Sequence, residues 1–447
     1  MLTVSMSGTN HYNRNSEGRN QWNTQVIVET LEPILHHLVD GENIVHRPTL
    51  LKRLLQEYGI QISRSTLNKY LKQFNLGGPK RAGFSIEQVE GVIVMHIRQH
   101  DPQNTDLPAR IAAALGSRGI HIARDMVRAV MKTHFPEGFD QRSRSATNKT
   151  SHNAVIQSYG PNDQLSIDGH DKLSSIGFPI YGMRDKFSRK WITLVAVPNN
   201  RTNVITSYLY LKTIRDMGGI PLQVTSDHGN EVMDIFGYQS ALRETAVAPL
   251  ADLIAKLDIG VAPEPHRFLS STRNITVERG WKPLVTKFNR KILVSTTNAI
   301  ASGDYIVDNR SHRVIYLFLM APLVLEELEM YKKAANCQVI RRQKGISLPS
   351  GMSANTAYTS EGQDCLLRLS PDSLDQVDRW IVDIEAAYPR LLCFLTWDEE
   401  SWVMLLWNHV CSVTGEQALP KVSLLNIWST FRLMTGHITD IPCLVNE

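Results

Sequence analysis

The sequence predicts a multidomain protein in which all-α N-terminal modules are followed by an α/β core and a mostly helical C-terminal region. The first indication is length, because 447 residues exceed the roughly 250–300 that one hydrophobic core usually serves. The second is a helical pattern that occurs twice before residue 140, and the third is a group of strand-like segments after residue 160. Hydrophobic residues make up 42% of the chain and charged residues 21%, which is typical of a folded protein.

Two segments near the N-terminus resemble each other at an offset of 60 residues. YGIQISRSTLNKYLKQFNLGG begins at Tyr58, and RGIHIARDMVRAVMKTHFPEG begins at Arg118. Each follows a helix-like segment, and Gly59 or Gly119 separates that segment from the next helix. We therefore predict two tandem helix-turn-helix modules.

The second helix of each module has an apolar face and a basic face. We expect the basic side chains to contact DNA phosphates, and they are Arg64, Lys69, Lys72, Arg124, Arg128 and Lys132. Solvated basic residues on an ordinary helical bundle would give the same pattern, so that alternative stays open.

Charge is distributed unevenly along the chain. Residues 46–150 carry 17 Lys and Arg against 8 Asp and Glu, which favours a polyanion as partner. Residues 361–447 carry 5 against 13, so we expect this region to contact protein or to cover the basic segment rather than to bind DNA.

The middle of the chain begins after a polar stretch, QRSRSATNKTSHNAVIQSYG, which is typical of a linker. DQLSID is a predicted strand, and FPIYGMRDKFSRKWITLVAVPNN contains two more strands joined by a turn. NVITSYLYLKTIRDMG then predicts a helix, and LQVTSD predicts a fourth strand. Three strands, a helix and a strand follow one another in the order of a ribonuclease H-like core.

Two aspartates stand at strand ends in this segment, and a glutamate follows on a helix. Asp168 and Asp227 end the first and fourth strands, so both can lie at one edge of the sheet. Glu278 lies on the predicted helix ITVERGWKPLVTKF, with Trp281 on the same face. Three convergent carboxylates suit hard divalent ions such as Mg²⁺. The alternative is a surface pair of Glu278 with Lys282, which would stabilise a helix by about 0.3–0.5 kcal/mol.

Several stretches resemble the successive motifs of one family. SIDGHDKL, GFPIYGMRDKFSRKW, VPNNR, TSDHGNE and NITVERGW look like motifs of the integrase-core (DDE-type) proteins of basidiomycete fungi, transposon-derived relatives of retroviral integrases. HFPEGFDQR and RRQKGISLPSGMSANTAY also resemble that family. By this resemblance the catalytic and metal-binding Asp, Asp and Glu of the family fall on Asp168, Asp227 and Glu278.

The resemblance implies an integrase or transposase, that is, a metal-dependent polynucleotidyl transferase. Such an enzyme would use two Mg²⁺ (or Mn²⁺) ions to cleave DNA and transfer strands. Double-stranded DNA is the expected partner, bound by a homo-oligomer, and Lys172, Arg273 and Arg279 would contact it near the carboxylates. Two alternatives stay open: a domesticated, catalytically silent DNA-binding protein, and a metal-dependent nuclease without strand transfer.

Two features depart from retroviral integrases. Asp227 and Glu278 are 51 positions apart, a longer separation than is typical of those enzymes, and we expect the intervening segment to add helices at the edge of the core. No cysteine precedes Cys337, so an N-terminal His-His-Cys-Cys zinc module cannot form. Helix-turn-helix modules would take its place in DNA binding.

These observations divide the sequence into seven parts. They are a disordered tail (1–22), the first helix-turn-helix module (23–80), the second module (83–140), a linker (141–162), the ribonuclease H-like core (163–300), its helical extension (301–360) and a Trp-rich acidic helical region (361–447).

No stretch reaches the roughly 20 apolar residues that cross a bilayer, so we expect no membrane span. The N-terminal segment lacks a charged start followed by an apolar run, and we expect an intracellular, nuclear protein. The five scattered cysteines argue against a disulfide framework and against a Cys-x-x-Cys zinc site. The sequence leaves open the DNA target, the oligomeric state and the role of residues 361–447.

Overall fold

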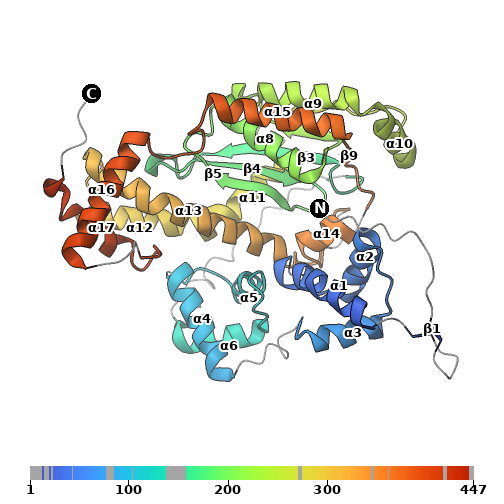
Figure 1. Cartoon of the computed structure of the whole chain (residues 1–447), viewed down its shortest axis with the longest axis horizontal. Helices are drawn as coiled ribbons and strands as arrows, with labels where there is room; N and C mark the ends of the chain where they lie inside the picture. The colour runs from blue at the N-terminus through green and yellow to red at the C-terminus, as the bar shows by residue number, and fades with distance from the viewer. Residues whose placement is uncertain are drawn as a thin grey trace. The chain divides into compact units, whose positions relative to one another are not determined.

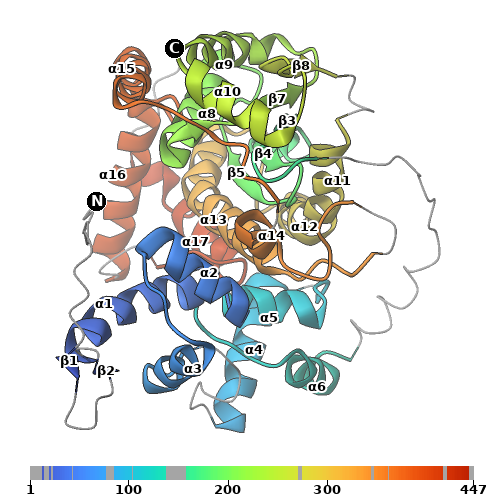
Figure 2. The same cartoon turned by 90° about the vertical axis from the view of Figure 1, so that its right-hand side faces the viewer.

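The computed structural model describes residues 13–14, 20–21, 24–42, 44–76, 85–102, 104–136, 158–269, 274–343, 347–360, 362–415 and 420–441 (Figures 1 and 2). Most of the tail predicted at 1–22 and of the linker predicted at 141–162 lies outside these residues. By its internal contacts the chain forms two compact units. The first comprises residues 1–83 with 117–121, and the second comprises residues 84–116 with 122–447.

The first unit is a small helical bundle. It contains α1 (Thr24–His36), a π-helical turn η1 (His37–Gly41), α2 (Arg47–Tyr58) and α3 (Arg64–Gln73), with a short hairpin of β1 (Asn13–Arg14) and β2 (Asn20–Gln21). Gly59 ends α2 with a φ of +66°, a conformation that glycine adopts without strain. Ser63 begins α3, because its hydroxyl accepts a hydrogen bond from the Thr66 amide. The predicted pair of helices joined by a turn is therefore present.

The helices of the second predicted module belong to the second unit. They are α4 (Ile86–His100), which begins with a capping box of Ser85 and Gln88, α5 (Pro108–Gly116) and α6 (Arg124–His134). α5 and α6 pack together, and α5 also packs on the long helix α13 (Arg310–Cys337). This helical group is thus joined to the core through the packing of α5 on α13, where Arg110 lies over the ring of Tyr331.

A five-stranded mixed sheet forms the centre of the second unit. Its order is β5 (Trp191–Ala196), β4 (Ile180–Asp185), β3 (Gln164–His170), β7 (Gln223–Ser226) and β8 (His266–Phe268). The pairs β3/β4 and β4/β5 are antiparallel, whereas β3/β7 and β7/β8 are parallel. β5 and β7 run in the same direction on opposite sides of the β4/β3 pair, so the chain must cross over between them, and α8 (Asn203–Met217) forms this connection. This arrangement fits the ribonuclease H-like core that the sequence predicts.

Helices cover both faces of the sheet (Figure 1). α8, α9 (Met233–Thr245) and α15 (Pro371–Ala387) lie over one face, where Leu165 and Ile167 of β3 enter the core. α11 (Ile275–Leu284) and α13 pack on the other face, α11 against β3 and β4 and α13 against β5. Alternate residues of each strand therefore enter different cores.

The segment between Asp227 and Glu278 contains the helices expected there and one strand that the sequence did not predict. A short 3-10 turn, η3 (Asn230–Val232), leads into α9, and α10 (Val247–Leu257) follows. β8 then adds the fifth strand before α11 begins. Its three residues are too few for an alternating pattern to be recognised.

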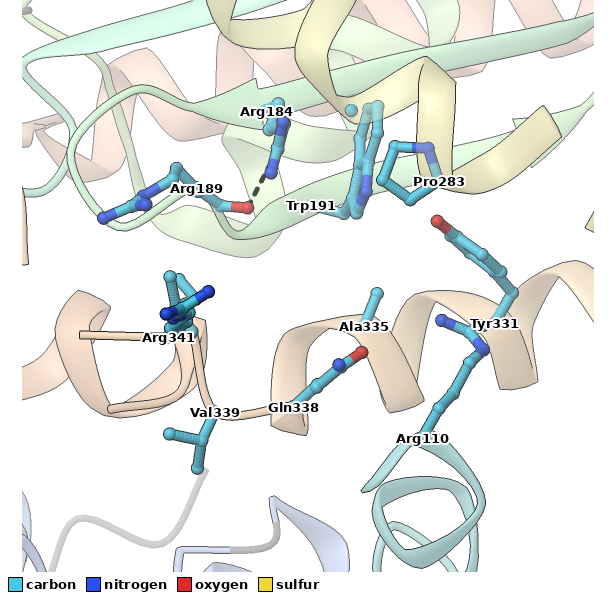
Figure 3. Close-up of a pocket in the computed structure, with 12 residues that line it drawn as sticks. Arg110, Arg184, Arg189, Trp191, Pro283, Tyr331, Ala335, Gln338, Val339 and Arg341 are labelled. Atoms are coloured by element: carbon cyan, nitrogen blue, oxygen red, sulfur yellow. Dashed lines mark hydrogen bonds between the residues drawn. The ribbon is translucent and has the colours of Figure 1, made fainter. Parts of the chain in front are cut away.

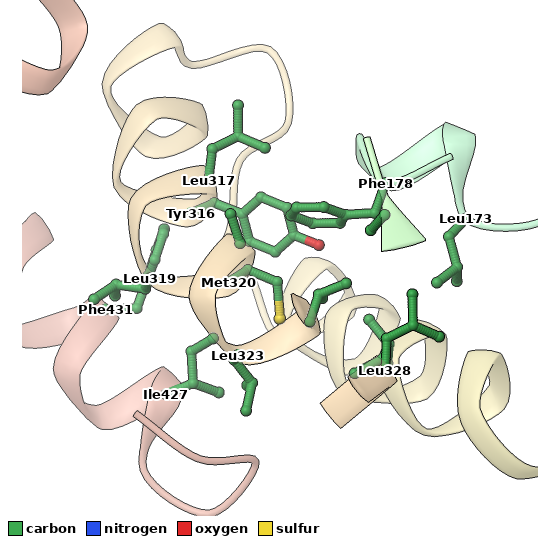
Figure 4. Packing of buried hydrophobic residues seen from close by; sticks show 14 of the residues in the cluster. Leu173, Phe178, Tyr316, Leu317, Leu319, Met320, Leu323, Leu328, Ile427 and Phe431 are labelled. Atoms are coloured by element: carbon green, nitrogen blue, oxygen red, sulfur yellow. The ribbon is translucent and has the colours of Figure 1, made fainter. Parts of the chain in front are cut away.

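The chain after α11 is mostly helical, as predicted, and it completes the hydrophobic core on the face of the sheet that α11 covers. It comprises η4 (Val285–Asn289), α12 (Arg290–Ala301), α13, α14 (Ala354–Ser360), α16 (Trp397–Thr414), α17 (Ile427–Thr435) and the short turn η5 (Ile438–Asp440), with β9 (Leu367–Arg368) pairing to β6 (Gly219–Ile220). Tyr316 and Met320 of α13 pack with Phe178 and with Phe431 of α17 in one cluster (Figure 4). Trp402 and Trp407 are buried in it as core residues. No helix in the described ranges is long and apolar enough to cross a membrane.

Gly182 of β4 lets α11 approach the sheet closely. A Cβ atom on Gly182 of β4 would lie 2.5 Å from Trp281 Cη2 and 2.7 Å from Trp191 Cζ3. We predict that Gly182→Ala lowers the free energy of unfolding by about 1–3 kcal/mol, because an overpacked core must shift side chains or backbone. Urea unfolding followed by tryptophan fluorescence measures this.

The matched control is Gly91→Ala on α4, where an added Cβ atom meets nothing within 4 Å. Because alanine favours helix, this control should leave the chain equally or slightly more stable. Equal stability of Gly182→Ala and Gly91→Ala would contradict the close packing of α11 on β4.

Candidate functional site

Asp168 lies on the face of β3 that α11 covers. Along β3, Ser166, Asp168 and His170 alternate with the apolar residues of the opposite core. The indole Nε1 of Trp281 donates a hydrogen bond to Asp168 Oδ2 at 2.9 Å. α11 therefore contacts the first carboxylate directly.

Buried polar contacts hold the first turn of α11 against the sheet. The Asn274 amide donates to the Ile167 carbonyl at 3.2 Å and accepts from the Ser166 hydroxyl at 2.8 Å. Arg184 of β4 donates to the Thr276 carbonyl at 2.7 Å. These contacts within the chain fix the position of α11 along β3 without the help of a ligand.

Asp227 and Glu278 lie close enough to Asp168 to affect its charge. Asp227 directly follows β7, whose Thr225 pairs with Ser166 of β3. Glu278 is exposed and precedes Trp281 by three positions on α11, so the two side chains share a face. Burial raises the pKa of Asp168 to about 7, and the negative charges of Asp227 and Glu278 add to this effect. Burial and Asp227 likewise raise the pKa of Glu278.

The donor set fits a divalent metal ion. Three carboxylates offer only oxygen ligands, as Mg²⁺ and Mn²⁺ prefer, and their mutual repulsion is relieved by a cation. Within the described part of the chain, only His409, His437 and Asp440 form a group of three whose ligand atoms all lie within 4.8 Å of one another. The ligand atoms of Asp168, Asp227 and Glu278 do not all lie within that distance of one another in this structure.

His170 supports the indole rather than acting as an exposed base. Its ring stacks on Trp281 with centroids 4.7 Å apart, and its Nε2 lies 2.8 Å from the Asn289 amide nitrogen, which donates to it. Burial, and to a lesser extent Lys172, lowers the pKa of His170 to about 4. The neutral ring is therefore the form present at neutral pH.

Tyr181 and Glu231 are further residues near the carboxylates. The Tyr181 hydroxyl is buried and has no hydrogen-bond partner among the described residues. Burial raises its pKa well above the ordinary value, and the charges of Asp168, Glu231 and Asp227 raise it further. Glu231 therefore adds a fourth negative charge to this part of the core.

A cavity of about 240 Å³ lies next to Trp191 of β5 (Figure 3). Trp191 and Gly280 line it, and the rings of Trp191 and Trp281 pack at a tilt of 36° with centroids 4.9 Å apart. Four arginines also line the cavity: Arg110, Arg184, Arg189 and Arg341. None of its described lining residues is acidic, and we call it the arginine cavity.

The arginines of the cavity are only partly neutralised. Arg110 pairs with Asp106 at 3.2 Å and stacks on Tyr331. Nε of Arg189 is buried and has no partner among the described residues. Burial, and in addition the charge of Arg189, lowers the pKa of Arg184 to about 10. Such a gathering of positive charge favours an anion.

The sequence-predicted basic residues lie at the surface wherever the structure describes them. Those on α3 and α6 are exposed, as are Lys172 and Arg279 near the carboxylates. Arg273 lies outside the described residues. Sequence reasoning missed the positioning roles of Asn274 and Asn289; Asn274 stands at the start of the quoted motif NITVERGW, which was the one available signal.

The central part of the chain matches a known family. Residues 155–359 match the model of the integrase core domain. The match covers a little under half of the chain and includes Asp168, Asp227 and Glu278. A comparison with curated proteins finds no match. The integrase core match, together with the mixed sheet, supports an integrase-like family for this region.

Because Asp168 is buried near two other carboxylates, replacing it by a neutral residue should stabilise the folded chain at high pH. The pKa of Asp168 is about 7 in the folded chain and about 3.9 in an unfolded one. The folded state therefore binds more protons between these values, and the wild type loses stability as the pH rises through them. Without metal, Asp168→Asn should raise the free energy of unfolding on the order of 1–3 kcal/mol at pH 8 and leave it unchanged at pH 4. Urea unfolding at both pH values measures the difference.

Glu244→Gln, an exposed position on α9, is the control and should show no such pH-dependent gain. Equal stability of the wild type and Asp168→Asn at pH 8 would show that the Asp168 carboxylate is not buried among like charges.

Proposed function

We propose that this chain is a DDE-type integrase or transposase-like enzyme, which binds DNA and uses divalent metal for phosphodiester cleavage and strand transfer. The observation that carries the proposal is the mutual electrostatic influence of Asp168, Asp227 and Glu278 within the segment that matches the integrase core. Integrase core domains generally use divalent metal ions. Asp168, Asp227 and Glu278 are the residues that would hold them.

Bound there, divalent ions would supply Lewis acidity at the scissile phosphate and lower the pKa of an attacking water or 3′ hydroxyl. The residues of the chain hold the carboxylates in place for that chemistry. Trp281 donates to Asp168 and thereby favours its charged form, the form that binds a cation. Asn274 and Arg184 fix the helix that carries Glu278.

Basic residues supply the DNA contacts in this proposal. Arg64, Lys69 and Lys72 on α3 and their counterparts on α6 are exposed, and each could contact a backbone phosphate. Lys172 and Arg279 lie beside the carboxylates in sequence and are exposed as well. The arginine cavity would receive a phosphate close to the strands that carry the site.

Glu278→Gln tests the catalytic assignment. The substitution removes a charged ligand with little change in shape, so several kcal/mol of charge stabilisation would be lost, or roughly a hundredfold or more in rate. We expect it to abolish nicking of supercoiled plasmid and joining of a labelled 3′-hydroxyl duplex to plasmid in Mg²⁺ or Mn²⁺. DNA affinity should stay within about twofold, because Glu278 makes no phosphate contact.

Lys282→Gln, one turn further along α11, is the matched control and should retain activity. Cleavage that survives Glu278→Gln would remove Glu278 from the site. Nicking by the wild type without joining would identify a nuclease, and DNA binding without either reaction would identify a silent DNA-binding protein.

Replacing Lys69 and Lys72 by Gln tests the predicted DNA-binding helix. Each phosphate contact contributes about 0.9 to the slope of log affinity against log salt concentration. The double variant should therefore bind a short duplex more weakly, and the magnitude of this slope should fall by about 2. Arg341→Gln tests the arginine cavity, and it should reduce the magnitude of the same slope by about 1. Fluorescence anisotropy at several salt concentrations measures both.

Arg342→Gln is the control for the arginine cavity, because Arg342 is the next residue, is exposed and does not line the cavity. Equal effects of Arg341→Gln and Arg342→Gln would mean that the cavity binds no phosphate of its own and that Arg341 contributes only to the general charge of the surface. An unchanged slope in the Lys69 and Lys72 variant would leave α3 as an ordinary bundle helix.

A further inference from the structure

Two histidines and an aspartate meet in the C-terminal helical region, away from the carboxylates of the core. His409 Nε2 on α16 lies 3.2 Å from Asp440 Oδ2. His437 Nδ1, directly before η5, lies 2.9 Å from the same oxygen. All three ligand atoms lie within 4.8 Å of one another.

We propose that His409, His437 and Asp440 bind one Zn²⁺ ion. Zinc takes His and carboxylate ligands in a tetrahedron with bonds of about 2.0–2.2 Å, so its ligand atoms are separated by roughly 3.3 Å. The two separations from Asp440 Oδ2 are close to this value. Two imidazoles and one carboxylate suit zinc, whereas Mg²⁺ prefers oxygen ligands alone.

The elements that carry these side chains are held by the hydrophobic core. Val410, next to His409, and Met434, three residues before His437, are both buried in the hydrophobic cluster that also contains Tyr316 and Phe431. Ile438 and Ile441, on either side of Asp440, pack against the same cluster. The three ligands thus project from a fixed framework, as a metal site requires.

Exposure leaves a place for the fourth ligand. The side chains of His409, His437 and Asp440 are 30%, 23% and 44% exposed, so a water molecule can reach the ion and the ion can enter from solvent. A bound ion would join the chain after α17 to α16.

The test is the zinc content of the purified full chain. Wild type and His409→Asn/His437→Asn are stripped with EDTA, incubated with Zn²⁺ in excess Mg²⁺ at pH 7.5, passed through a desalting column and analysed by mass spectrometry for metal. We expect one zinc per wild-type chain and none in the double variant. Replacing Zn²⁺ by Co²⁺ should give the visible absorption of a tetrahedral site in the wild type only.

Two further variants separate this site from the others. His134→Asn removes a histidine that pairs with Glu90 without a second histidine, and it should keep the full zinc content. Asp168→Asn/Asp227→Asn should also keep it, so a failure of the proposed catalytic site does not affect this result. A wild type that retains no zinc, or a folded His409→Asn/His437→Asn variant that retains it, would overturn the proposal and leave an ion pair of surface side chains.

Discussion

The hydrogen bond from Trp281 to Asp168 joins the packing of the core to the electrostatics of the site. The indole packs closely over Gly182, stacks on His170, packs at a tilt against Trp191, and still directs its N–H at the carboxylate. The same contact sets the position of Glu278, because Glu278 lies one helical turn before Trp281. If α11 shifted along the sheet, both carboxylates would lose their positions together.

Charges of opposite sign lie on either side of this tryptophan pair. Trp281 meets the buried carboxylate, whereas Trp191 lines the arginine cavity. Burial makes each group of like charges costly, so each is more stable with a counter-ion. A chain that holds a divalent cation on one side and an anion such as phosphate on the other would satisfy both groups.

The sequence predicted the parts of this fold that depend on local pattern. β3, β4, β5, α8 and β7 were recognisable because apolar residues alternate or recur at helical spacing along them, and their order led to the ribonuclease H-like core. β8 was not predicted, because three residues after a proline-containing loop carry no periodicity. Asp227 directly follows β7, as predicted, but the prediction that Asp168 ends its strand was wrong, because β3 continues to His170 and its last residues still pair with β4.

Contacts that depend on tertiary packing could not be read from the sequence. Asn274 reaches Ser166 and Ile167 across more than a hundred residues, and the cluster of His409, His437 and Asp440 forms only when α16 and α17 pack together. DNA binding by the basic helices α3 and α6 involves a second molecule and is not a matter of packing within the chain, so it stays a prediction.

The measurement that bears most directly on the central claim is calorimetric titration of Mg²⁺ or Mn²⁺ into the chain with a short DNA duplex present. The wild type should bind the ion saturably, and Asp168→Asn/Asp227→Asn should not bind it although the duplex still binds. Equal binding by the two proteins, or none by a wild type that holds the duplex, would contradict a metal site at these carboxylates.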